Sequence, residues 1–174
     1  MIKSEIKDEE IQLDSKKYII SETDEKGKIT YCNDYFMEVS GYNKDELIGT
    51  AHNIVRHPDM PKIVFKLLWQ TISSGKNINA VVKNLAKDGR YYWIFTAFEI
   101  KKDTNTNEIV GYHASRKSIS HHVIEIIDSL YKELLNIEQK DGIDASEKYL
   151  IEFLKEKGED IEFANIMEEI HRFY

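Results

Sequence analysis

The residues best suited to chemistry in this 174-residue sequence lie in one short stretch, HNIVRHPDMP, at positions 52–61. It contains two histidines, one arginine, one aspartate and both prolines of the chain. An arginine guanidinium presents a rigid fork of donors to paired oxygen atoms, and a histidine titrates near neutral pH. Because the prolines restrict the backbone, we expect this stretch to form a pre-organised, basic corner of a binding site.

Other uses of these side chains need weighing. Arg56 and Asp59 are three residues apart and also suit a simple ion pair that stabilises a loop, an alternative that stays open. His52 and His57 have no acidic or cysteine partner at ligand spacing, so we expect no metal site. The cluster suits acid–base chemistry, but no nucleophile with a base accompanies it, and the sequence contains no Walker loop, GxSxG or HExxH motif. We therefore expect that the protein is not an enzyme.

Composition sets the class of protein. The chain is 41% hydrophobic and 32% charged, which is typical of a soluble protein with a real core. Its single cysteine, Cys32, excludes an internal disulfide and a CxxC motif, and no apolar run approaches the length of a membrane-spanning helix. The acidic start does not suit a signal peptide, so we expect a cytoplasmic protein. The net charge of −7 argues against nucleic-acid binding.

Charge is distributed unevenly along the chain. Residues 121–174 contain 14 acidic and 6 basic side chains, whereas residues 1–120 contain 17 and 18. This shift predicts three parts: an N-terminal helix or arm at residues 1–17, a domain at residues 18–120, and an acidic helical extension at residues 121–174.

The central domain reads as a mixture of short strands and helices. Alternating and β-branched patterns predict five strands, at 18–23, 28–32, 77–86, 90–102 and 109–119. Capping residues and helical periodicity predict helices at 33–41, 43–49 and 61–74. This order predicts an α+β fold, with a five-stranded antiparallel sheet and all the helices inserted between the second and third strands.

Three segments resemble the PAS domain family: GKITYCNDYFMEVSGYNKDELIG, NLAKDGRYYW and IVGYHASRKSI. The resemblance covers about residues 15–120. Together with HNIVRHPDMP it is similar to the sensor domain of bacterial aerotaxis and energy-taxis receptors. It implies a PAS fold that binds FAD non-covalently and reports redox state. Because no methyl-accepting segment is present, the chain is most similar to the soluble PAS partner of a bipartite energy-taxis receptor.

That resemblance also implies partners and site residues. The partner would be a membrane-bound methyl-accepting chemotaxis transducer, which would bring the protein to the membrane without inserting it; a homodimer stays open. Asn84 matches the family's flavin-contacting asparagine, and Trp69 and Trp93 offer aromatic walls, although both also suit an ordinary core. The FAD-binding residues expected are Asn84, Arg56, His57, Trp69, Asp59, His52, Asn53 and Trp93.

One departure from the aerotaxis pattern keeps other functions open. Ile78 stands where the aerotaxis pattern usually has a tryptophan, and an isoleucine cannot stack as a ring does. A haem-binding sensor is the first alternative, with His52, His57 and His113 as candidate ligands. A ligand-free interaction module is the second. Cys32 is not at the position of the reactive cysteine in light-sensing flavin domains, so we expect no blue-light adduct.

The acidic extension shows helical periodicity. A heptad-like seam of Val123, Ile127, Leu130, Leu134 and Ile137 predicts the first helix; Asp144 is expected to cap a second; and Phe163, Ile166, Ile170 and Phe173 form a third apolar stripe. These helices would form a small bundle, lie across the sheet or dock on a partner, and the sequence leaves the three open.

Overall fold

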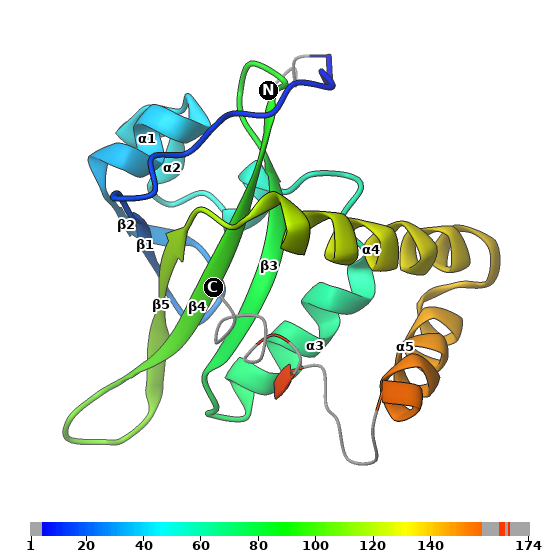
Figure 1. Cartoon of the computed structure of the whole chain (residues 1–174). Helices are drawn as coiled ribbons and strands as arrows, with labels where there is room; N and C mark the ends of the chain where they lie inside the picture. The colour runs from blue at the N-terminus through cyan, green and yellow to red at the C-terminus, as the bar shows by residue number, and fades with distance from the viewer. Residues whose placement is uncertain (1–4, 158–163, 166, 168–174) are drawn as a thin grey trace.

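A five-stranded antiparallel sheet forms the centre of the protein in the computed structural model, which describes residues 5–157, 164–165 and 167 (Figure 1). The strands are β1 (Ile19–Thr23), β2 (Ile29–Cys32), β3 (Ile78–Leu85), β4 (Tyr91–Lys102) and β5 (Ile109–Lys117), in the spatial order β2-β1-β5-β4-β3. Between β2 and β3 lie α1 (Asp34–Ser40), α2 (Lys44–Leu47), the 3-10 helix η1 (His52–Val55) and α3 (Lys62–Ser73). The predicted architecture is confirmed.

The two faces of the sheet contact different helices. Side chains alternate along a strand, so Val82 and Thr96 face α3, whereas Val81 and Trp93 lie on the positions that face the opposite side. There α4 (His121–Asp141) crosses the sheet, and Tyr131 stacks on the Trp93 ring with centroids 6.3 Å apart. The Tyr131 hydroxyl also donates to the backbone carbonyl of Val81 at 2.8 Å.

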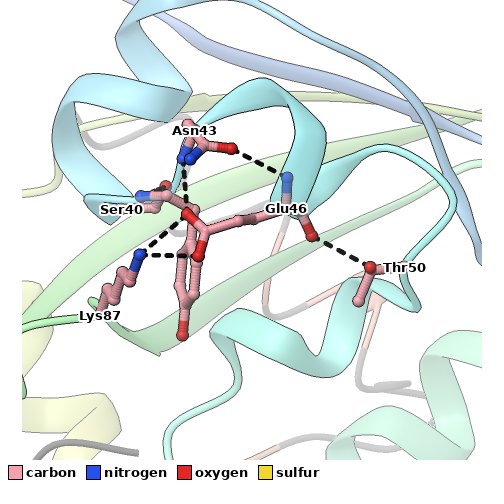
Figure 2. A network of polar contacts seen from close by, with 6 residues as sticks. Ser40, Asn43, Glu46, Thr50 and Lys87 are labelled. Atoms are coloured by element: carbon pink, nitrogen blue, oxygen red, sulfur yellow. Dashed lines mark hydrogen bonds and ion pairs between the residues drawn. The ribbon is translucent and has the colours of Figure 1, made fainter. Parts of the chain in front are cut away.

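Local capping explains why the short helices form. The Asn33 side chain accepts a hydrogen bond from the Phe36 amide at the start of α1. The start of α2 is a capping box in which Asn43 and Glu46 exchange hydrogen bonds (Figure 2). Lys87, in the β3–β4 turn, donates to both Glu46 carboxylate oxygens at 2.7 and 2.9 Å and lowers the pKa of Glu46. The capped helix is thereby joined to the sheet.

The helix α3 begins one residue later than its sequence suggests. Pro61 occupies the N-cap position, with φ −61° and ψ 138°, and contributes no capping side chain. Helix α3 ends at Ser73, before Gly75, as predicted. Before it, the backbone of Arg56 pairs with that of Asn84, so the segment after η1 covers the free edge of β3.

The described segments before and after this domain lie against it. Residues 5–17 contain no helix and run as an arm beside the β3–β4 turn, where the Lys7 amide donates to Gly89 and the Ile11 amide to Tyr91. After α4, α5 (Ile143–Lys157) descends beside α3 (Figure 1). Asp144 lies in the first turn of α5 and is not its cap.

In α4 the buried side chains are Val123, Ile127, Tyr131 and Leu134, so Tyr131 belongs to a seam that the heptad pattern missed. The predicted third apolar stripe, Phe163, Ile166, Ile170 and Phe173, lies outside the described residues. Across the part of the chain that the structure describes, no helix has the length and apolar character needed to span a membrane.

Candidate functional site

A cavity of about 200 Å³ lies between the inner face of the sheet and α3. Helix α3 forms one wall, the segment from Ala51 to Arg56 closes one end, and the β1–β2 turn lies at the rim. The apolar lining consists of Phe65, Leu68, Trp69, Ile72, Val82, Phe98, Tyr112 and Ala114, and the polar lining includes Ser21, His52, Asn53, Arg56, Asn84, Thr96 and Arg116. The cavity therefore combines an apolar slot with polar groups from several elements, as ligand sites do.

The most polar part of the lining centres on Arg116 of β5. Its side chain is buried, with 3% exposure, and donates to Ser21 Oγ at 2.9 Å and to the Ala114 carbonyl at 3.3 Å. Its second terminal nitrogen lies 2.9 Å from His52 Nε2. Burial lowers the pKa of Arg116 to about 10, so the guanidinium remains charged at neutral pH.

His52 is neutral in this arrangement. Because an arginine can only donate, His52 Nε2 accepts the Arg116 hydrogen bond, and the ring proton lies on Nδ1. Burial, followed by the charge of Arg116, lowers the pKa of His52 well below its ordinary value. The Phe36 ring stacks on the imidazole with centroids 5.7 Å apart and fixes its orientation.

Two buried polar atoms in the lining have no hydrogen-bond partner within the described part of the protein: Arg56 Nε and Thr96 Oγ1. The Arg56 guanidinium carbon lies 3.6 Å from the centroid of the Phe65 ring, and burial lowers the pKa of Arg56. Thr96 is fully buried in the middle of β4. Buried polar groups are normally paired, so these two atoms are available to hydrogen-bond a bound molecule.

Asn84 lines the cavity from β3, with only 4% of its surface exposed. Its amide nitrogen lies 3.5 Å from the Tyr92 hydroxyl, on the residue directly opposite in β4. An amide can both donate and accept, so Asn84 suits a ligand edge that carries both kinds of group.

Trp69 marks the rim of the cavity. Its side chain is 37% exposed and meets the Tyr112 ring edge to face, with centroids 5.6 Å apart. Across the rim lies Gly27, whose φ of +77° suits only glycine, and a Cβ built there would lie 3.0 Å from the Trp69 ring. The glycine therefore makes room for the indole.

The structure brings together five of the eight predicted site residues: Asn84, Arg56, Trp69, His52 and Asn53. The other three do not line the cavity. Trp93 points to the α4 side of the sheet, because it is adjacent in the strand to the inward-facing Tyr92. His57 and Asp59 lie in the loop between η1 and α3, outside the lining.

His57 is buried, and its Nδ1 accepts from the Asp59 amide at 3.1 Å. The His57 ring meets Tyr91 edge to face, and the Asp59 carboxylate pairs with Lys83 at 3.0 Å. No ion pair joins Arg56 to Asp59 among the described residues, since Asp59 turns toward β3. Both residues therefore support the loop that presents Arg56.

Arg116, Ser21 and Thr96 line the cavity but were not among the predicted site residues. A signal was present for Arg116, because the alternation in the last strand places it on the same face as Tyr112 and Ala114. An arginine on the inward face of a central strand needs a partner, and the sequence supplies no acidic residue on that face. Ser21 and Thr96 carry no such signal.

The charge of the lining is one-sided. It includes Lys26, Arg56 and Arg116, whereas no aspartate or glutamate lines the cavity in the portion of the chain described by the structure. A buried cation without an anion is costly, so the lining favours a ligand that brings negative charge or several acceptor oxygens. With the apolar slot beside it, a flat, acceptor-rich, anionic molecule fits these residues.

Comparison with known proteins agrees with the fold. Residues 29–115 match the family model described as the PAS fold. The aerotaxis receptor of Escherichia coli is 39% identical over 117 residues, which is 67% of this chain but 22% of the receptor, so the chain spans about a fifth of that relative.

Two solved structures share the fold at lower identity. A Light-Oxygen-Voltage domain studied with a flavin analogue aligns with a TM-score of 0.56 and 19% identity, over 63% of this chain and 82% of that one. A PAS domain from Colwellia psychrerythraea aligns with a TM-score of 0.53 and 22% identity, over 59% and 86%. The family model covers half of the sequence: this chain belongs to the PAS fold family.

Proposed function

We propose that this protein is a redox sensor that binds FAD non-covalently in the cavity between the sheet and α3. One observation carries the proposal: the lining has three basic side chains, no described acidic one, and two buried polar atoms without partners, beside an apolar slot. The similarity to the E. coli aerotaxis receptor and to a Light-Oxygen-Voltage domain studied with a flavin analogue supports the same ligand class.

The residues present suit the parts of this ligand. Phe65, Leu68 and Val82 offer apolar contact to a flat ring system, and the Asn84 amide suits an edge that alternates donors and acceptors. Arg56 and Arg116 supply positive charge to negative or electron-rich atoms. Lys26, exposed at the rim, would contact phosphate groups that extend toward solvent.

A bound flavin supplies reversible electron transfer, and the chain supplies the environment in which it occurs. Arg116 remains cationic and His52 neutral at physiological pH, because burial opposes a second positive charge beside the first. The polar end of the cavity therefore favours added negative charge without needing a proton from His52. Asn84 and Thr96 orient the ligand through hydrogen bonds.

The alternatives have less support. Of the three candidate haem ligands, His57 does not line the cavity, and His113 lies on the other face of the sheet, 3.5 Å from Glu22. His52 does line it, but its Nε2 is occupied by Arg116. A ligand-free interaction module would leave the buried Arg116 and the half-buried Arg56 without an anion among the described residues.

For the signal we propose transfer through α4 and α5 to a separate, membrane-bound methyl-accepting chemotaxis transducer, with the protein itself in the cytoplasm. The similarity to the aerotaxis receptor supports a signalling partner of this kind. Helix α4 contacts both the sheet and α3, and α5 contacts α3, so the two helices are placed to follow changes in the cavity.

The absorption spectrum of the purified protein tests the ligand, followed by chromatography of what a denaturant releases. We expect a two-band yellow spectrum and released FAD. Released FMN would correct the ligand, and an intense Soret band or a colourless protein that takes up no flavin would refute the proposal.

A matched pair of variants tests the site. Asn84→Ala should lower flavin affinity about tenfold, as expected for the loss of one buried hydrogen bond. Asn79→Ala, on the opposite face of the same strand, should retain wild-type affinity. Equal affinities would exclude the assigned role of Asn84.

A further inference from the structure

We infer that Glu138 of α4 is a positioning residue for the cavity: it caps α3 and so makes the α4–α5 hairpin part of the support of the ligand-binding wall. The positioning role rests on the geometry of the protein itself. Its consequence for signalling rests on the proposed function.

Helix α3 has no cap of its own. Pro61 precedes it and offers no side-chain acceptor, so the first amides of the helix need partners from elsewhere. Both Glu138 oxygens supply them: Oε2 accepts from the Lys62 amide at 2.9 Å, and Oε1 accepts from the Ile63 amide at 2.7 Å. A carboxylate at this end also complements the helix dipole.

This contact is long-range. Glu138 lies 76 and 75 residues after its two partners in the sequence and belongs to the last turn of α4. The far end of α4 extends past the edge strand β3 (Figure 1). The α4–α5 hairpin thus wraps around that edge. One of its helices lies on the outer face of the sheet and the other beside α3.

A second contact, one turn further along α3, joins it to the other helix of the hairpin, α5. Lys66 Nζ lies 2.6 Å from Glu147 Oε2 and 3.7 Å from Asp144 Oδ1, both on α5. The hydrogen bond from Glu147 raises the pKa of Lys66. Two points of attachment resist both rotation of α3 about its axis and movement along it, whereas a single cap would not resist rotation.

The side of α3 next to Lys66 forms the cavity wall. Phe65, Leu68 and Trp69 lie on it, and Trp69 reaches the rim. A helix of 12 residues moves largely as a unit, so a displacement at Lys62 and Lys66 also displaces the ring of Trp69. The hairpin therefore sets the position of the wall.

Coupling of this kind is reciprocal. If the hairpin holds α3 in the position that a ligand prefers, a ligand state that shifts α3 weakens the two contacts by the same free energy. The hairpin is then the element whose attachment reports the state of the cavity. A partner that binds the released hairpin would favour one ligand state.

Hydrogen exchange across residues 62–73 tests the positioning role directly. In Glu138→Ala, amide exchange there should be about 5- to 30-fold faster than in wild type, as expected for the loss of a helix cap. Glu138→Gln retains a neutral acceptor and should fall between the two. The control is Glu133→Ala, an exposed acidic residue of the same helix, which should exchange as wild type does.

Flavin release supplies a readout that stability alone would not move. When each variant is measured at the same interval below its own melting temperature, Glu138→Ala should release flavin several-fold faster than Glu133→Ala. Identical exchange in the two variants would overturn the inference. If the protein binds no flavin, the proposed function fails, but the exchange experiment still decides the role of Glu138.

Discussion

Replacing Arg116 with glutamine should separate the stability of the ligand-free protein from its affinity for ligand. The substitution removes a buried charge and retains one hydrogen-bond donor. Burial lowers the pKa of Arg116 from 12.5 to about 10, a cost to the charged form of about 3 kcal/mol. Against this, the bonds to Ser21, Ala114 and His52 contribute about 1 kcal/mol each.

These opposing contributions nearly cancel without ligand. We expect the free energy of unfolding of the ligand-free Arg116→Gln protein to remain within about 1 kcal/mol of wild type. The ligand-bound protein differs, because a charged hydrogen bond to an anionic ligand contributes about 1.5–3 kcal/mol. Flavin affinity should therefore fall about 10- to 150-fold.

The assay is urea unfolding of the ligand-free protein together with flavin titration by fluorescence quenching. Arg90→Gln is the control, since Arg90 lies in the β3–β4 turn and pairs with Asp88 away from the cavity. An Arg116→Gln protein that binds flavin within about twofold of wild type would refute the reasoning. In that case the positive charge of the lining would have no role in binding.

Three further changes test the surroundings of the cavity. Gly27→Ala should lower stability by about 1–2 kcal/mol because of its positive φ, and shift Trp69 fluorescence; Gly49→Ala has a similar φ of +79° but no neighbour within 4 Å, and should show the first effect without the second. His52→Gln should reduce the loss of stability that the wild-type protein shows below about pH 6.5. Folding lowers the pKa of His52, so below that pH the unfolded chain binds a proton there that the folded chain does not. In the wild-type protein this lowers the free energy of unfolding by up to about 1.4 kcal/mol per pH unit. Tyr131→Phe should cost about 1–2 kcal/mol, because it leaves a buried carbonyl of β3 without its partner, and equal urea midpoints for the two proteins would exclude that contact.

Local signals made most of the fold predictable. The caps at Asn33 and Asn43, the turn at Gly27 and the alternation in the strands each depend on neighbours within a few residues, and each predicted element of the central domain forms. The predicted starts of two helices were wrong: Pro61 precedes α3, and Asp144 lies inside the first turn of α5. A helix start depends on which amides find partners, and for α3 those partners come from a distant helix.

The site was less predictable because it depends on register. Tyr92 and Trp93 are adjacent and both aromatic, and only the pairing of Asn84 with Tyr92 shows which of them faces the cavity. The same reasoning applies across β4 and β5, where Thr96 pairs with Arg116. A one-residue shift would exchange the two faces, so a composition-based reading cannot choose between them.

Register also explains where the charges of the protein lie. The chain has a net charge of −7, yet its cavity is lined by bases, because the alternation of β5 places Arg116 inward, while Glu138 and Glu147 meet α3 from outside the cavity. Helix α3 therefore lies between a basic interior and an acidic hairpin. The basic interior attracts a ligand that brings negative charge, whereas the acidic hairpin already satisfies the first amides of α3 and Lys66. A change in ligand charge would act on α3 from within the cavity, and the contacts opposing it would be those of Glu138 and Glu147.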